Sequence, residues 1–179
     1  MSGHSHWAGI KRQKEVTDKK RGIVFSKLLV AITAAAKNEP NPDFNPRLRT
    51  AVEKARENKV PADNIARAVK RASEAGNNVE ELLFEAYGPG GIALLIEAAS
   101  DSKNRTVAEI KKILGDNHGK WAESGSVRWA FEIHEAHSEE KWRAKFPQSL
   151  EEADAANLLK LVEALEAHND VQSVYTNAE

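Results

Sequence analysis

Apolar residues in the first part of the chain recur every three or four positions, the spacing of one face of an α-helix. This pattern predicts a first helix over residues 18–38, whose buried face carries Phe25, Leu28, Leu29, Ile32 and Ala36. Prolines then interrupt the pattern, and Asn45 before Pro46 is a typical N-cap for a second helix over residues 46–58. A third helix begins at Pro61 and continues to about Ala72. Three short helices with narrow, alanine-rich faces predict a small bundle.

The second part of the chain changes to runs that are typical of strands. Two such runs, 82–87 and 92–100, flank the sequence Gly-Pro-Gly-Gly at 88–91 and predict a hairpin. A helix over 105–117, a strand over 126–131, a helix over 149–168 and a strand over 171–178 follow. Ser149 and Glu152 have the spacing of a capping box for the last helix. This order predicts an α+β fold, in which helices cover a mainly antiparallel sheet.

The charges divide at the same place as the hydrophobic pattern. The chain has a net charge of -1, but residues 1–75 hold 16 Lys and Arg against 8 Asp and Glu, whereas residues 76–179 hold 10 against 19. We therefore expect a basic helical domain with an N-terminal arm (1–75), a short linker, and an acidic α+β domain (79–179). A basic half suggests a polyanion as partner, although the two halves could instead neutralise each other.

Composition narrows the class of protein. The 179 residues include no cysteine, which excludes disulfides and thiolate metal sites. No apolar run has the roughly 18 residues that a membrane span needs, and the N-terminus lacks the apolar core of a signal peptide. We expect a cytoplasmic protein with no membrane partner.

Motifs that could carry enzyme chemistry are weak. The Gly-Pro-Gly-Gly stretch lacks the Gly-Lys-Ser/Thr of a phosphate-binding loop and is better explained as a tight turn. His134 and His137 resemble a zinc-protease pair but are one residue too close, and no third ligand is evident. No nucleophile elbow and no acid–base carboxylate pair stands out. The sequence thus predicts a protein that is not an enzyme, with no metal, no cofactor and no small-molecule substrate.

Basic residues of the front half are the candidates for nucleic-acid binding, since they can neutralise phosphates and release counterions. The candidates are Lys11, Arg12, Lys14, Lys19, Lys20, Arg21, Lys27, Arg67, Lys70 and Arg71. Trp7 could stack on an exposed base, although an apolar anchor on the helical bundle is the commoner role of a tryptophan. The cations on the third helix could equally be an ordinary solvated face.

A series of motifs along nearly the whole chain resembles the YebC/PmpR family, which also includes a mitochondrial translational activator. The motifs are Gly3–Ala8, Phe25–Leu28, Asn45–Arg49, Pro61–Ile65, Ala68–Arg71, Tyr87–Gly91, Asn104–Glu109, Gly125–Val127 and Asp170–Ala178. The resemblance implies a helical N-terminal domain, α+β domains and no catalytic activity. Family members are described as DNA-binding transcriptional regulators or as translation factors that act at the ribosome.

The chain departs from that family in one large respect. The family's usual further α+β domain, which follows the third strand, is replaced here by residues 132–148. His6 and Gln13 also stand where basic residues are usual.

Three functions follow from these observations. The first is a DNA-binding transcriptional regulator. The alternative is a ribosome-associated translation factor that binds ribosomal RNA. No helix pair carries a clear base-reading set of Asn, Gln and Arg, which weakens sequence-specific DNA readout, and a basic arm with a tryptophan suits structured RNA at least as well. The third is a protein–protein adaptor.

Overall fold

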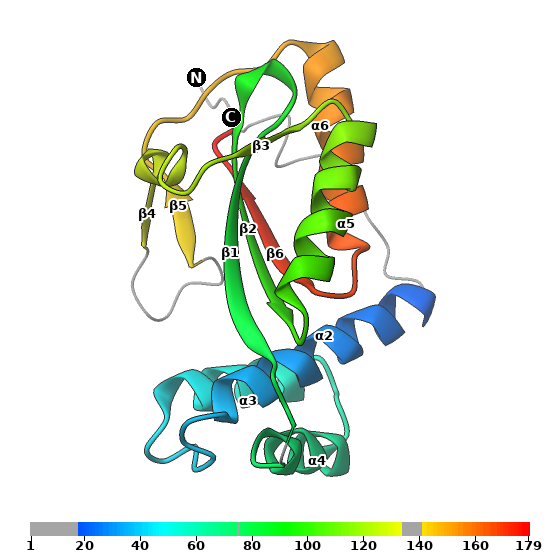
Figure 1. Ribbon diagram of the computed structural model, residues 1–179, viewed down its shortest axis with the longest axis vertical. Helices are drawn as coiled ribbons and strands as arrows, with labels where there is room; N and C mark the ends of the chain where they lie inside the picture. The colour runs from blue at the N-terminus through cyan, green and yellow to red at the C-terminus, as the bar shows by residue number, and fades with distance from the viewer. Residues whose placement is uncertain (1–17, 75, 134–140) are drawn as a thin grey trace.

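A computed structural model describes residues 18–74, 76–133 and 141–179, together with the side chains from Lys20 onward in the first of these ranges. Its elements are α2 (Asp18–Ala36), α3 (Pro46–Glu57), α4 (Ala62–Ala72), β1 (Glu80–Tyr87), β2 (Ala93–Ser100), α5 (Lys103–Asp116), β3 (Lys120–Ala122), β4 (Phe131–Ile133), β5 (Trp142–Ala144), α6 (Glu152–Glu166) and β6 (Val171–Thr176). Two 3-10 turns, η1 (Pro89–Gly91) and η2 (Arg128–Ala130), complete them. The predicted α+β fold is confirmed (Figure 1). Across these ranges, no helix combines the length and the apolar character that a membrane crossing requires.

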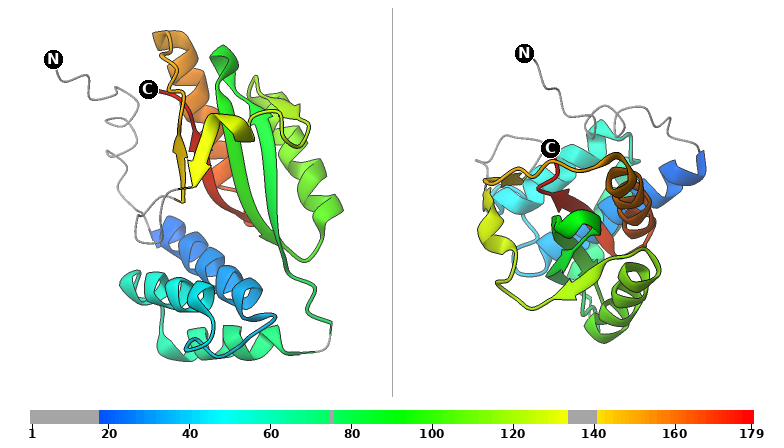
Figure 2. Two further views of the ribbon diagram at one scale, coloured as in Figure 1. Left: turned by 90° about the vertical axis from the view of Figure 1, so that its left-hand side faces the viewer. Right: turned by 90° about the horizontal axis from the view of Figure 1, so that it is seen from above.

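Helices α2, α3 and α4 pack around their own hydrophobic core at one end of the molecule (Figures 1 and 2). Ile32, Leu48 and Ala55 are completely buried there. Asn45 caps α3 as predicted, because its side-chain oxygen accepts from the Leu48 N–H at 3.0 Å. Its amide nitrogen donates to the carbonyl of Ala35 at 2.8 Å, so the same side chain joins the end of α2 to the start of α3.

The second half is a four-stranded sheet with the strand order β3-β1-β2-β6, in which every neighbouring pair is antiparallel. The predicted hairpin is confirmed, since β1 pairs with β2 from Glu80↔Ser100 to Tyr87↔Ala93. Its turn requires glycine because Gly90 and Gly91 have positive φ angles of 69° and 75°.

Strand β2 lies in the middle of the sheet and is buried on both faces. On one face Leu94 and Ile96 belong to a core that α5 and α6 cover. On the other face Leu95 belongs to a smaller core with Phe131 and Trp142 of the β4–β5 hairpin. Figure 1 shows the two helices on one side of the sheet and the hairpin on the other. The sheet is therefore the middle layer of three, which explains why the predicted strand 92–100 is apolar except at Glu97 and Ser100.

Two local predictions were wrong. The strand predicted over 126–131 is instead a loop, the turn η2 and the beginning of β4, and the short strand β3 was not predicted. The capping box of Ser149 and Glu152 does not form: α6 begins at Glu152, and its N-cap Glu151 makes no side-chain cap hydrogen bond. The chain before α6 is held elsewhere, because Gln148 forms a β-bridge with Ala178 at the C-terminus.

Candidate nucleic-acid interface

The outer face of α4 carries the clearest group of cations in the described structure. Arg67, Lys70 and Arg71 are exposed, whereas the opposite face of the helix packs into the helical core through Ile65, Ala68 and Ala72. Spacings of three and four residues place the three cations on neighbouring positions of one helix surface. Helix α4 lies at the end of the molecule that is opposite the helices α5 and α6 and most of the four-stranded sheet (Figure 1). These cations are thus presented to solvent by a helix whose other face is fixed.

Local contacts orient part of this group. The Arg67 guanidinium donates to the side-chain oxygen of Asn64, and its Nε lies 3.3 Å from the carbonyl of Asp63. Lys70 and Arg71 are in the last turn, where positive charge also stabilises the helix dipole. The three cations therefore have a structural benefit as well as an exposed position.

The other candidates have different positions. Lys20 and Arg21 are exposed near the start of α2, and Arg21 takes part in a further interaction within the chain. The Lys19 side chain, Trp7, Lys11, Arg12 and Lys14 lie outside the described residues, as do His134 and His137.

Two cations of the front half contact the acidic half instead of solvent alone. The Lys27 ammonium donates to the backbone carbonyl of Glu166 at the end of α6. Burial lowers the pKa of Lys27, although the Glu166 carboxylate opposes the shift. Arg47 of α3 forms an ion pair with Glu81 of β1. Because Lys27 is already bonded within the chain, it is less suited to a phosphate than the cations of α4.

The acidic second half of the chain (76–179) contains a buried carboxylate that the sequence analysis did not single out. Glu85 of β1 is only 4 % exposed, and its two oxygens accept from the backbone N–H groups of Gly125, Val127 and Arg128 at 2.6, 2.7 and 3.0 Å. Burial by itself raises the pKa of Glu85, but these three hydrogen bonds outweigh it and the pKa lies below its ordinary value. Glu85 thus fixes the loop between β3 and η2 against the sheet.

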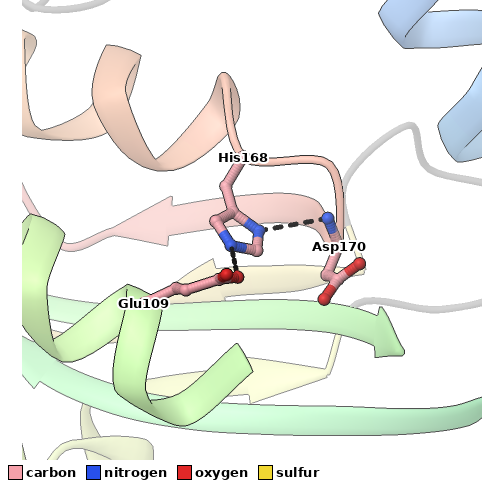
Figure 3. A group of neighbouring side chains, drawn as sticks. All are labelled: Glu109, His168 and Asp170. Atoms are coloured by element: carbon pink, nitrogen blue, oxygen red, sulfur yellow. Dashed lines mark hydrogen bonds and ion pairs between the residues drawn. The ribbon is translucent and has the colours of Figure 1, made fainter. Parts of the chain in front are cut away.

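A second polar cluster joins α5 to the turn before β6, and Figure 3 shows three of its members. Donor atoms of Glu109, His168 and Asp170 lie within 4.8 Å of one another, as metal ligands would. However, the Asp170 carboxylate already accepts from Thr106 Oγ1 at 2.6 Å and from Arg105 at 2.9 Å.

The histidine of this cluster is also fully used. His168 Nδ1 accepts from the Asp170 N–H at 3.1 Å, so Nε2 carries the proton that it shares with Glu109 at 2.7 Å. A cation would have to displace that proton and lie beside Arg105. The chemistry of this donor set is that of a structural network, in which hydrogen bonds hold the pKa of Asp170 below its ordinary value although burial alone would raise it.

Both networks join residues that are far apart in the chain. Glu85 and Val127 are 42 positions apart, and Thr106 and Asp170 are 64 apart. The sequence gave one indication of these networks, because their residues belong to or border the motifs shared with a family. The motifs did not indicate what role the residues have.

Comparisons with known proteins cover almost the whole chain. The family model described as "TACO1/YebC protein N-terminal domain" matches residues 5–75, and the one described as "TACO1/YebC second and third domain" matches residues 79–137 and 132–178. A solved structure, that of a conserved hypothetical protein from Aquifex aeolicus, is 30% identical and has a TM-score of 0.85 over 98% of this chain and 97% of that chain.

Curated relatives carry one recurring name. A "Probable transcriptional regulatory protein" of Chloroherpeton thalassium is 41% identical over 100% of this chain and 96% of the relative. Another, of Chlorobaculum tepidum, is 53% identical over 73% of this chain and 53% of the relative. The first alignment extends over 239 positions, whereas this chain has 179 residues, so about 60 positions of that relative have no counterpart here.

Proposed function

The chain belongs to the TACO1/YebC family, as its motifs suggested, and from that premise we propose that it is a DNA-binding transcriptional regulator without catalytic activity. Its relatives are named probable transcriptional regulatory proteins. The observation that carries the proposal is the exposed group of Arg67, Lys70 and Arg71 on the outer face of α4. In this proposal the cations of α4, of the start of α2 and of the N-terminal arm contact the phosphate backbone.

A second function is favoured by the chemistry of α4 itself. Its one side-chain amide is that of Asn64, whose oxygen accepts from Arg67, so the helix offers cations for phosphates but no amide that is free to read adenine through both of its polar atoms. Contacts of this kind position a protein on a nucleic acid without specifying sequence. We therefore carry a ribosome-associated translation factor, bound to ribosomal RNA, as the alternative.

The first experiment removes the cations of α4. A triple variant, Arg67→Ala, Lys70→Ala and Arg71→Ala, is titrated with duplex DNA at several salt concentrations. We expect weaker binding and a shallower dependence of log K on log salt, by about 0.9 for each phosphate that the variant no longer neutralises.

The matched control removes the same number of charges from the acidic domain. The control is a triple variant of exposed lysines on α5: Lys103→Ala, Lys111→Ala and Lys112→Ala. It changes the net charge by the same amount as the α4 variant and leaves α4 intact. An α4 variant whose affinity and salt slope match those of the control would show that α4 is not the interface.

The second experiment separates the two functions. Sedimentation of the protein with ribosomes is compared with titrations on promoter and random duplexes at the same salt. A preference for promoter DNA supports the transcriptional role. Ribosome binding without such a preference supports the alternative.

A further inference from the structure

Two aromatic side chains lie exposed and in contact on the hairpin side of the acidic domain. Trp129 of η2 and Phe146, just after β5, have ring centroids 5.6 Å apart at an interplanar angle of 48°. They are 64% and 54% exposed. Neither ring is needed to fill the core beneath the hairpin, which is formed by Phe131, Trp142 and their neighbours. Neighbouring large apolar groups left in solvent mark an interaction surface.

Hydrogen bonds hold the two rings and the backbone around them in place, and none of these bonds uses the π face of a ring. The Trp129 indole N–H donates to the carbonyl of Ser126 at 2.7 Å, within the loop that Glu85 fixes. On the other side, the Asn177 amide donates to the Phe146 carbonyl at 2.9 Å. The Lys145 N–H donates to the Ala130 carbonyl at 2.8 Å, which joins the two segments. The pair is therefore positioned before any partner binds.

The two described segments that carry the pair are rich in positive charge, although the second half of the chain is otherwise acidic. The described segments 128–133 and 141–148 contain Arg128, Lys141, Arg143 and Lys145 against one acid, Glu132. The Lys145 ammonium lies 5.7 Å from the centre of the Phe146 ring, whereas Lys141 is paired with Glu97. The intervening residues 134–140, which include three glutamates, lie outside the described part of the chain.

We propose that Trp129 and Phe146 form a stacking platform for the unpaired bases of a single-stranded nucleic acid, with Lys145 beside it to contact a phosphate. Aromatic faces next to cations are the chemistry by which proteins bind single strands, because every base has a π face. Duplex DNA does not offer its base faces, so this surface would act separately from the cations of α4. The inference extends the proposed function, on which it rests for the class of ligand.

The test compares variants that keep or remove the π faces. In the double variant Trp129→Leu and Phe146→Leu the apolar character stays but stacking is lost, whereas Trp129→Phe and Phe146→Tyr keep both rings. Each full-length protein is titrated with fluorescent oligouridylate, with oligothymidylate and with duplex DNA. We expect the leucine variant to bind both single strands about 5- to 100-fold more weakly. Its duplex affinity and circular dichroism should match wild type, and the aromatic variant should keep its affinity for single strands.

The α4 triple variant, run in parallel, separates this inference from the proposed function. The platform is supported if the leucine variant, but not the aromatic variant, loses affinity for single strands and keeps its affinity for duplex DNA. This holds even if the α4 variant binds duplex DNA normally and the proposed function fails. A leucine variant that is folded and binds single strands as tightly as wild type would overturn the platform and assign the surface to an apolar protein partner. If the leucine variant loses equal affinity for single strands and for duplex DNA, the platform is overturned too, because stacking on unpaired bases cannot account for a loss of duplex binding.

Discussion

Glu85 gives the sharpest test of how the acidic domain is held together. Truncation in Glu85→Ala removes the acceptor for three backbone N–H groups at once. Glu85→Gln keeps one carbonyl oxygen, which can still serve Val127 and Arg128, but its amide group faces the Gly125 N–H. The alanine variant should therefore lose more stability than the glutamine variant.

The magnitude follows from which donors can reach water. Gly125 and Arg128 are exposed residues whose N–H groups can be rehydrated, whereas Val127 is 1% exposed. One buried orphaned donor and the loss of two charge-assisted bonds destabilise the alanine variant, but removing the carboxylate also removes the cost of burying it, so the net loss should be about 2–4 kcal/mol. The glutamine variant, which loses one bond and the charge, should cost about 1–2 kcal/mol.

Urea unfolding of the full chain, followed by circular dichroism and tryptophan fluorescence, measures both variants. With an m-value of about 2 kcal/mol/M, the alanine change lowers the unfolding midpoint by about 1–2 M. Because the folded pKa of Glu85 lies below its ordinary 4.5, its contribution is present above that pH and is lost as the pH falls through the folded pKa. The stability difference between wild type and Glu85→Gln should therefore be constant near neutral pH and shrink in acid.

Two results would refute this reasoning. One is an alanine variant whose midpoint equals that of wild type, since the loop would then not depend on the carboxylate. The other is a difference between wild type and the glutamine variant that stays the same down to pH values well below 4.5, since it would then not arise from an ionised Glu85.

Three further changes test other parts of the acidic domain. Asp170→Asn removes the charge that accepts from Thr106 and should cost about 1.5–3 kcal/mol in urea unfolding at neutral pH, whereas an unchanged midpoint would mean that the network is dispensable. Gly90→Ala places a Cβ at a positive φ and against Leu150, and should lower the melting temperature through a cost of at least about 1–2 kcal/mol; an unchanged melting temperature would contradict this. Leu161→Ala empties a fully buried position and should cost about 2–5 kcal/mol, and a loss below about 1 kcal/mol would mean that the core around it can collapse.

The elements with long periodic patterns could be predicted from the sequence, and the short ones could not. The helices α2, α3 and α4 were expected within a few residues of their bounds because each buries one continuous stripe. Strand β3 has three residues, too few for any pattern. Residues 126–131 were predicted as a strand because Val127, Trp129 and Phe131 alternate with other residues, but the N–H groups of Val127 and Arg128 donate to Glu85 and not to a neighbouring strand.

The candidate site was predictable in part for the same reason. Charge and helical spacing indicated Arg67, Lys70 and Arg71 together, and the structure places them on one exposed face. Neither charge nor spacing could show that Lys27 turns toward Glu166, because that contact crosses 139 positions of sequence. The contact between Trp129 and Phe146 could not be predicted from the sequence either, because it depends on the antiparallel pairing of β4 with β5.

That pairing also bears on the prediction that residues 132–148 stand in place of a further domain of the family. Ile133 at the end of β4 is directly opposite Trp142 at the start of β5, so the chain leaves and re-enters the domain at adjacent points. The two matched regions of the family model meet over this same stretch, at residues 132–137. A domain whose two ends are close together can be inserted or deleted between such adjacent strand ends, while the three layers around the sheet keep their architecture. We therefore predict that the roughly 60 positions of the relative without a counterpart here form a module that leaves and re-enters the sheet at this pairing.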